Sequence, residues 1–394
     1  MYDAVIVGGR VAGSSTAMLL ARAGHRVLVV DKGHFPSDTL STHYIHQPGM
    51  ELLARWGLLG ALDDSGCPPI QRISLDYSTF AIEGPVPSLG TIRSTYAPRR
   101  YILDSLLMEA AVASGAEFRD HCRVKALVTE GNRVCGVQLA DSEGRTETVA
   151  SHLIVGADGM RSTVAQLTGA ATYATHPTLT CAYYTYWSNL PVSGFQTYHA
   201  LGKGVGATPT HDDLTLVVMY LPRAEFPRVR QDAYRIYLDT IHDTAPDLYS
   251  RLISEAHQVE RLYGTGQQPN FYRQASGPGW VLVGDAGHHQ DSITGWGMTA
   301  AFQQAQLLAD LLPDTLSDYH ATVYALKRFT ELRDALLQTA HSTALWAAEL
   351  HPLSEALLAP AIDDPAKTER LLSLVGGFLS TEEAFADMST YTTG

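Results

Sequence analysis

The sequence predicts an α/β protein with a Rossmann-type nucleotide-binding domain, an interleaved antiparallel β-sheet domain that binds substrate, and C-terminal helices. The chain opens with a strand, a glycine turn, a helix and a second strand. Aromatic and β-branched residues become frequent after about residue 171, and near residue 280 an apolar strand leads into another glycine-rich loop and helix. At 394 residues the chain exceeds one ordinary core, so two cooperating domains are expected.

The opening unit predicts a dinucleotide site. Residues 4–7 form an apolar, β-branched run, and residues 13–23 have helical spacing that stops at Gly24. A second strand, residues 26–30, ends at Asp31. A helix N-terminus attracts a pyrophosphate, and a carboxylate after the second strand accepts a ribose hydroxyl.

The glycine turn departs from the Gly-x-Gly-x-x-Gly pattern at one position. Gly8 and Gly13 are present, but Arg10 stands where the middle glycine lets the backbone approach the phosphates. Its side chain therefore either points away or reaches over the phosphates, with which a guanidinium pairs well.

Composition and charge exclude several classes of protein. Hydrophobic residues make up 45% and charged residues 18%, and the formal net charge of −13 disfavours binding to nucleic acid or to anionic membranes. No run approaches the roughly 18 apolar residues of a spanning helix, and the chain begins with a strand in place of a signal peptide. We therefore expect a cytoplasmic protein without stable membrane association.

Cysteine and histidine spacing predicts no metal. The cysteines form no CxxC pair, and the histidines form no HExxH or similar cluster. We expect four buried free thiols, at Cys67, Cys122, Cys135 and Cys181.

The chain then alternates between the two domains. A long loop at residues 32–49 is expected to be a binding element, and residues 70–92 alternate as antiparallel strands. A helix is predicted at residues 101–114, followed by an antiparallel meander at residues 124–149. The expected limits are residues 1–70, 98–170 and 275–320 for the nucleotide-binding domain, 71–97 and 171–274 for the substrate domain, and 321–394 for the C-terminal helical region.

Further elements are predicted in the last two thirds of the chain. Residues 256–263 have strand character, residues 298–312 and 316–350 have helical periodicity, and the polar tail beyond residue 379 is expected to be a loose terminus.

Aromatic residues of the second domain are candidate substrate contacts. CAYYTYW, residues 181–187, and LTLVVMYL, residues 214–221, read as strands. Side chains alternate along a strand, so Tyr184 and Tyr186 share one face, and only one face can line a pocket. We take Tyr184, Tyr186 and Met219 as candidates, with ordinary core packing as the alternative.

The sequence segment most specific for a binding function is WVLVGDAGHHQDSITGWGM, residues 280–298. Asp285 at a strand end can accept hydrogen bonds from sugar hydroxyls, and the amides of Gly297 and Met298 open a helix that favours negative charge on an electron-rich ring. The alternative is a structural turn capped by Asp285.

Together these motifs resemble a known family. The glycine turn with Asp31, the Arg100-x-x-x-Asp104 helix start, GADGMRS at residues 156–162 and the GDAG…GWGM segment occur in the order found in FAD-dependent monooxygenases of the para-hydroxybenzoate hydroxylase fold. These are the group A flavoprotein monooxygenases, whose superfamily includes geranylgeranyl reductases and flavin halogenases. The resemblance runs from residue 2 to about residue 312.

The resemblance implies roles for individual residues. It implies that Gly8, Arg10, Ala12 and Gly13 hold the FAD pyrophosphate, that Asp31 binds the adenosine ribose, and that Lys32 and Val124 contact the adenine. Arg100 would approach the phosphates or the ribityl chain, and Asp285 would bind the ribityl hydroxyls. Gly295, Gly297 and Met298 would border the flavin ring. Asp158 is associated with FAD packing and nicotinamide use, or is a helix cap that orients Arg161.

Two departures from the motifs of the superfamily disfavour halogenation and isoprenoid reduction. Residues 185–189 lack the Trp-x-Trp-x-Ile-Pro motif of tryptophan-type halogenases, and residues 40–44 lack the Cys-Gly-Gly element of geranylgeranyl reductases. The resemblance then implies a monooxygenase of secondary metabolism that uses NAD(P)H as a transient reductant. It would use O2 and a flavin C4a-hydroperoxide to hydroxylate or epoxidise a small aromatic or polyketide-like substrate. Two alternative functions are a flavin-dependent C=C reductase or dehydrogenase and a non-redox cyclase or binding protein. A homodimer is a possible oligomeric state.

Three side chains are candidates for catalysis. His43 and His46 lie in the loop expected near the flavin, and histidine titrates near neutral pH, where it can deprotonate a phenol. Trp296 is the candidate for ring stacking. A satisfied or solvent-facing histidine is the alternative at both histidine positions.

Overall fold

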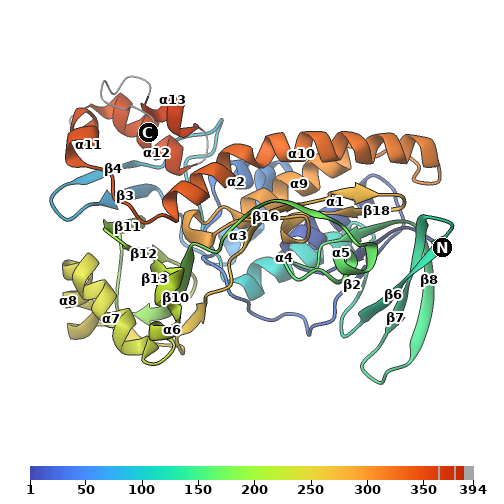
Figure 1. Cartoon of the computed structure of the whole chain (residues 1–394), viewed down its shortest axis with the longest axis horizontal. Helices are drawn as coiled ribbons and strands as arrows, with labels where there is room; N and C mark the ends of the chain where they lie inside the picture. The colour runs from blue at the N-terminus through green and yellow to red at the C-terminus, as the bar shows by residue number, and fades with distance from the viewer. Residues whose placement is uncertain (363, 377–378, 386–394) are drawn as a thin grey trace.

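The computed structural model describes residues 1–362, 364–376 and 379–385, and it confirms the expected fold class. Two large sheets lie side by side, with helices along the first and at both sides of the second (Figure 1). None of the helices in these residues has the length and hydropathy needed to cross a membrane.

The first sheet has the order β17-β18-β8-β1-β2-β5, and its central strands run parallel. Both faces of these strands are buried, which explains their continuous apolar runs. Its strands are β1 (Tyr2–Val7), β2 (Val27–Val30), β5 (Glu117–Arg119), β8 (Thr146–Gly156), β17 (Ser276–Gly277) and β18 (Trp280–Leu282).

Helices cover one face of this sheet and a meander covers the other. Aliphatic side chains of the helices share a core with β1 and β2, and Figure 1 shows α9 and α10 lying along the sheet. The helices are α1 (Val11–Arg22), α2 (Gln47–Arg55), α3 (Leu59–Asp64), α4 (Arg100–Ala113), α9 (Gly297–Leu311) and α10 (Tyr319–Ala347). The meander joins β6 (Arg123–Glu130) and β7 (Arg133–Ala140) to β8, as the sequence predicts.

The second sheet has the order β14-β10-β13-β12-β11-β3-β4. The two strands at one end come from a segment about 100 residues earlier in the chain than the others, so this sheet is interleaved with the first, as expected. Its strands are β3 (Arg72–Asp76), β4 (Ala81–Pro85), β10 (Thr180–Ser188), β11 (Phe195–Ala200), β12 (Lys203–Pro209), β13 (Thr215–Pro222), β14 (His257–Gln258) and the attached β15 (Tyr263–Thr265).

The two faces of the second sheet pack differently. One face packs against α7 (Ala233–Thr244) and α8 (Pro246–Ser254), and the opposite face turns toward the first sheet. The C-terminal helices α11 (Glu355–Ile362), α12 (Pro365–Val375) and α13 (Thr381–Phe385) gather beside β3 and β4 (Figure 1).

Short elements account for the differences from the sequence prediction. The strand predicted at residues 256–263 is two short strands, β14 and β15, and a third sheet, β19-β16-β9, was not predicted because strands of two to five residues carry little periodicity. Its strands are β9 (Thr172–His176), β16 (Asn270–Arg273) and β19 (His288–His289). The loose terminus predicted beyond residue 379 begins instead with α13, and residues 386–394 lie outside the described residues.

The remaining elements are short helices: α5 (Thr163–Thr168), α6 (Phe226–Val229), η1 (Arg223–Glu225), η2 (Gly284–Ala286) and η3 (Ser292–Thr294). The domain limits given above stay a prediction.

Candidate functional site

A cavity of about 580 Å³ lies at the carboxyl ends of the parallel strands. Its walls include the last residues of β1 and β2 and the segments that follow β8 and β18, together with residues of β10 and β13 from the second sheet. Open α/β sheets bind ligands outside the carboxyl ends of their strands. The fold therefore places the N-terminal motif and the 280–298 motif on one cavity.

Two helix N-termini open onto this cavity. Val11 and Ala12 begin α1, Gly297 and Met298 begin α9, and all four line the cavity. Neither helix has a hydrogen bond from its N-cap side chain to the first turn. Each helix start thus presents backbone N–H groups and a positive dipole end to a ligand.

The turn between β1 and α1 requires glycine at two positions. Gly8 has φ +107°, and a Cβ there would lie 2.4 Å from the carbonyl oxygen of Ala157. A Cβ on Gly13 would lie 1.8 Å from the carbonyl oxygen of Gly8. Both approaches are impossible for a side chain, so the close packing of the helix start on the strand depends on these glycines.

Asp31 is fixed at the edge of the cavity by backbone amides. Its Oδ2 accepts a hydrogen bond from the N–H of Gly9 and its Oδ1 accepts one from the N–H of Gly33, both at 2.7 Å. A carboxylate has further lone pairs, so each oxygen can still accept a sugar hydroxyl. Lys32 and Val124 line the cavity beside it.

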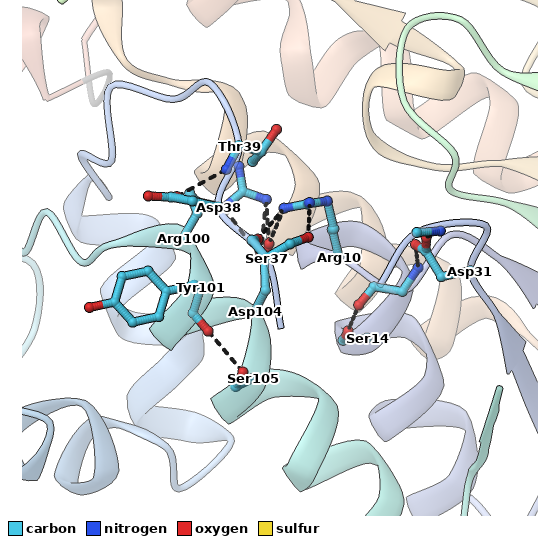
Figure 2. A network of polar contacts seen from close by, with 12 residues as sticks. Arg10, Ser14, Asp31, Ser37, Asp38, Thr39, Arg100, Tyr101, Asp104 and Ser105 are labelled. Atoms are coloured by element: carbon cyan, nitrogen blue, oxygen red, sulfur yellow. Dashed lines mark hydrogen bonds and ion pairs between the residues drawn. The ribbon is translucent and has the colours of Figure 1, made fainter. Parts of the chain in front are cut away.

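A buried carboxylate holds two arginines at the cavity wall (Figure 2). Asp104 has no exposed surface, and its Oδ2 lies 2.8 Å from Nη1 of Arg10 while its Oδ1 lies 3.0 Å from Nη2 of Arg100. Nη2 of Arg10 also donates to the Ser37 hydroxyl at 2.9 Å. The guanidinium of Arg10 is therefore oriented by Asp104 while it still lines the cavity.

Asp158 caps a helix and lines the cavity, and its part in FAD packing and nicotinamide use stays a prediction. Its Oδ2 accepts hydrogen bonds from the N–H groups of Thr163 and Val164 at 2.6 and 3.3 Å, so it caps α5. Its Oδ1 is buried without a hydrogen-bond partner among the described residues, and Asp158 lines the cavity. Burial raises the pKa of this carboxyl group. Arg161 bonds to Gln267, so Asp158 does not orient it.

Unpaired polar atoms on the wall indicate a polar ligand. Both amide atoms of Gln290 and the Oδ1 of Asp158 are buried without partners in the described chain. Burying such atoms is unfavourable unless a ligand or water pairs with them. Together with Asp285 and Gly295, which also line the wall, these groups fit a ligand with phosphates, sugar hydroxyls and a polar ring system.

A second, mainly apolar cavity of about 160 Å³ adjoins the first. Thr42, Val218, Tyr220 and Gly295 line both cavities. The other walls come from β11, β12 and β13 and from α10, α11 and α12, and include Phe195, Leu216, Trp346, Leu358 and Leu371. No carboxylate occurs among the lining residues, all of which lie in the described part of the chain.

Two hydroxyl groups in the second cavity are unpaired. Oγ1 of Thr208 and Oγ1 of Thr294 are buried without hydrogen-bond partners among the described residues. The sequence does not predict this cavity, because its walls come from segments far apart in the chain and the C-terminal helices carry no motif.

The structure separates the predicted substrate contacts. Tyr184 lines the first cavity, and Val218 and Tyr220 on the neighbouring strand line both. Met219 was a wrong prediction: it pairs with Tyr183 in the register of β10 and β13, and packs with Tyr183 in the core formed with α7. Alternation along β13 thus points Val218 and Tyr220, and not Met219, toward the cavities.

Tyr186 and His43 form a buried contact behind the cavity wall. His43 Nε2 is hydrogen-bonded to the Tyr186 hydroxyl, and the Arg99 guanidinium carbon lies 3.9 Å from the centre of the Tyr186 ring. Neither Tyr186 nor His43 is among the residues that line the two cavities in the described chain. Burial, and then nearby arginines, lower the pKa of His43 well below its usual range. These two residues thus lie outside the two cavity linings, and their expected substrate contact and proton transfer stay predictions.

His46 and Trp296 are packed together in the same region. His46 Nε2–H donates to the Thr294 carbonyl at 2.8 Å, and its ring centre lies 4.6 Å from that of Trp296. Trp296 packs into a small core with Ala300 of α9 and Leu337 of α10. Burial lowers the pKa of His46 to about 4. Neither lines either of the two cavities in the described chain, and their contacts with reacting groups stay predictions.

Comparison with known proteins identifies the class. Residues 1–342 match the family described as FAD binding domain, and the chain belongs to this family. It is an FAD-dependent oxidoreductase of the superfamily that the sequence motifs resemble. The unpaired polar groups and the paired helix starts of the large cavity fit this cofactor.

Two curated relatives have different names. The "Probable electron transfer flavoprotein-quinone oxidoreductase YdiS" of Escherichia coli is 30% identical over 184 residues, which cover 43% of this chain and only 39% of that protein. A "Digeranylgeranylglycerophospholipid reductase" of Methanocella arvoryzae is 25% identical over 349 residues, 85% of this chain and 83% of that protein.

Solved structures share the fold. The flavin-dependent brominase Bmp2 has a TM-score of 0.83 at 19% identity, with 98% of this chain and 97% of that chain covered. PqsL of Pseudomonas aeruginosa, titled "a probable FAD-dependent monooxygenase", has a TM-score of 0.74 at 20% identity, with 95% and 99% covered. At this identity the similarity shows the fold alone.

Proposed function

We propose that this chain is a monooxygenase that hydroxylates or epoxidises a small aromatic or polyketide-like molecule, with NAD(P)H as a transient reductant. One substrate molecule, O2, NAD(P)H and a proton would give the oxygenated product, water and NAD(P)+. The observation that carries the proposal is the apolar second cavity, which shares Val218, Tyr220 and Gly295 with the cavity suited to FAD.

Different residues of the chain would bind different parts of FAD. Asp31 would accept the adenosine ribose hydroxyls, Arg10 and Arg100 would lie by the phosphates, and Asp285 would accept the ribityl hydroxyls. The amides that begin α9, at Gly297 and Met298, would border the flavin ring. When bound, FAD supplies electron transfer from NAD(P)H and the activation of O2.

The second cavity would hold the substrate and keep water out. Aromatic and aliphatic walls exclude water, which protects reactive oxygen chemistry from side reactions. The unpaired hydroxyls of Thr208 and Thr294 would hydrogen-bond to a hydroxyl or carbonyl group of the substrate and so orient it.

Acid–base groups have a minor part in this cavity. His199, which lines it, is hydrogen-bonded to the Thr197 hydroxyl at 2.9 Å, and burial lowers its pKa to about 4. At neutral pH it is therefore uncharged. Lys203, which also lines the cavity, is paired with Asp243 at 2.5 Å. A mainly apolar cavity with its lysine paired suits a substrate that is itself uncharged and already electron-rich.

A reductase that saturates a C=C bond is the second candidate. The relative from Methanocella arvoryzae, which aligns with 85% of this chain, carries a reductase name, and an apolar cavity also accommodates an unsaturated hydrocarbon chain. The two reactions differ in their need for O2.

The experiment measures NADH- and NADPH-driven turnover of the FAD-loaded protein with a panel of phenols, naphthoquinones and polyenes, in air and without oxygen. A monooxygenase consumes one O2 per product and incorporates 18O from 18O2. Anaerobic saturation of a double bond at the aerobic rate would establish the reductase in its place. If neither nicotinamide reduces the bound flavin with any ligand, the non-redox alternative takes precedence.

Matched variants locate the substrate. Leu216→Trp adds bulk to the second cavity, the one of the two that Leu216 lines, and should abolish substrate-dependent turnover while FAD stays bound. Met219→Leu, on the opposite face of the same strand, keeps the side-chain volume and should leave turnover unchanged. Equal turnover of both variants would place the substrate elsewhere.

A further inference from the structure

Three side chains of metal-binding type meet at the surface beside the large cavity. His34 lies in the loop after β2, and Asp120 and His121 directly follow β5. His34 Nδ1 lies 3.6 Å and His121 Nε2 lies 3.8 Å from Oδ2 of Asp120. In the described part of the chain this is the one group of three such residues whose ligand atoms all lie within 4.8 Å of one another.

We propose that His34, Asp120 and His121 form a binding site for a divalent transition metal ion such as Zn²⁺. A tetrahedral zinc ion with bonds of about 2.0–2.1 Å places its ligand atoms about 3.4 Å apart. The measured separations of 3.6 and 3.8 Å exceed this by a few tenths of an ångström. Rotation of side chains that are 68%, 35% and 52% exposed supplies that adjustment.

The backbone holds the ligand-bearing segments together. The N–H of His121 donates to the carbonyl of Gly33 at 3.1 Å, and the N–H of Cys122 donates to the carbonyl of Asp31 at 2.8 Å. Oδ2 of Asp120 accepts a hydrogen bond from the N–H of Phe35 at 3.3 Å. The two segments are thus in register before an ion binds, which lowers the entropic cost of forming the site.

The ligand set selects the kind of ion. Two imidazoles and one carboxylate suit Zn²⁺, Cu²⁺ or Ni²⁺, with water in the remaining position, whereas Mg²⁺ and Ca²⁺ prefer oxygen ligands alone. The formal net charge of −13 also favours a cation.

The site borders the large cavity. Asp31, Lys32, Cys122 and Arg123, in the same two segments, line that cavity. A bound ion would therefore link the two segments next to the adenosine-binding part of the FAD site. The sequence alone predicts no metal, because His34 is distant in the chain from Asp120 and His121 and the three show no spacing pattern.

The test is equilibrium dialysis of the FAD-loaded, chelator-treated protein against ZnCl2. The wild type should bind one Zn²⁺ per chain at this site. His34→Ala and His121→Ala should each weaken that binding at least tenfold, and Asp120→Asn should weaken it while keeping the hydrogen bond from Phe35. His320→Ala, which removes an exposed histidine outside the group, is the matched control and should bind like the wild type.

Two further measurements keep the test independent of folding. The flavin spectrum and content of each variant show whether it is folded, and an excess of MgCl2 should leave the bound zinc in place. Absence of zinc binding by the wild type, unchanged binding in both histidine variants, or displacement of zinc by Mg²⁺ would each overturn the proposal.

Discussion

Substitution of Asp104, whose carboxylate pairs with both Arg10 and Arg100, tests whether this buried ion pair stabilises the cavity wall. Asp104→Asn keeps the shape of the side chain and removes its charge. Asp104 is fully buried and its charge is balanced by Arg10 and Arg100, so the substitution leaves two guanidinium groups without their counter-charge.

The magnitude follows from burial. Removing one partner of a buried ion pair costs about 3–5 kcal/mol. The Arg100 side chain is 11% exposed, so its pair with Asp104 is close to that case, whereas the Arg10 side chain is 32% exposed and solvent screens it. Because asparagine keeps an oxygen acceptor, we expect a loss of about 2–3 kcal/mol in the free energy of unfolding.

A matched pair elsewhere isolates the effect of burial. Glu51 and Arg55 have the same i,i+4 spacing on α2, but their side chains are 46% and 57% exposed. Glu51→Gln should cost less than about 0.5 kcal/mol. Urea unfolding of both variants at neutral pH and a fixed FAD concentration, followed by tryptophan fluorescence, gives the comparison. A loss below about 1 kcal/mol for Asp104→Asn, or equal losses for the two variants, would refute the view that burial makes this ion pair important.

Three further predictions concern the cavities and the pH dependence of stability. Gly13→Ala places a Cβ 1.8 Å from a carbonyl oxygen of the β1–α1 turn and should abolish FAD retention. A Cβ at Gly297 meets nothing within 4 Å, so Gly297→Ala should leave the apoprotein stable while weakening FAD binding. Flavin content after gel filtration and thermal unfolding measure both effects. Thr208→Val should raise the KM about fivefold for a substrate with a hydroxyl or carbonyl group, as expected for the loss of about 1 kcal/mol. In steady-state assays Thr244→Val, which removes an equally unpaired buried hydroxyl outside the cavities, should leave the KM unchanged. Burial lowers the pKa of His46 to about 4, below the roughly 6.5 of an unfolded chain, so the unfolded state binds more protons between these pH values. The free energy of unfolding should therefore fall from pH 7 to pH 5, by up to about 1.4 kcal/mol per pH unit from this residue, and a His46→Gln variant with an undiminished slope in urea titrations would contradict this.

The FAD-binding half of the molecule was predictable because its constraints are local. The glycine turn, its helix and Asp31 lie within one short stretch, and the close approaches at Gly8 and Gly13 give the steric reason for these two glycines. The 280–298 motif was likewise predictable from the sequence, since a strand end, a loop and a helix start follow one another directly.

The rest depends on which segments meet. The face of β13 that turns toward the cavities is set by its pairing with β10, so Met219 and Val218 could not be told apart before the register was known. The sequence makes the histidines of the predicted flavin loop catalytic candidates because of their residue type, but the buried contacts of His43 and His46 depend on the fold.

The arrangement also explains how one fold serves proteins with different names. The residues suited to FAD come from the first sheet, α1, α4 and the start of α9, whereas the second cavity is walled by the second sheet and by α10, α11 and α12. These two sets meet at the segments that carry Thr42 and Gly295. Changes in the C-terminal helices can therefore alter the shape of the second cavity without disturbing cofactor binding. With the substrate in the second cavity, as proposed, substrate choice should depend on residues such as Trp346 and Leu371, which lie beyond the residues 1–342 that match the family.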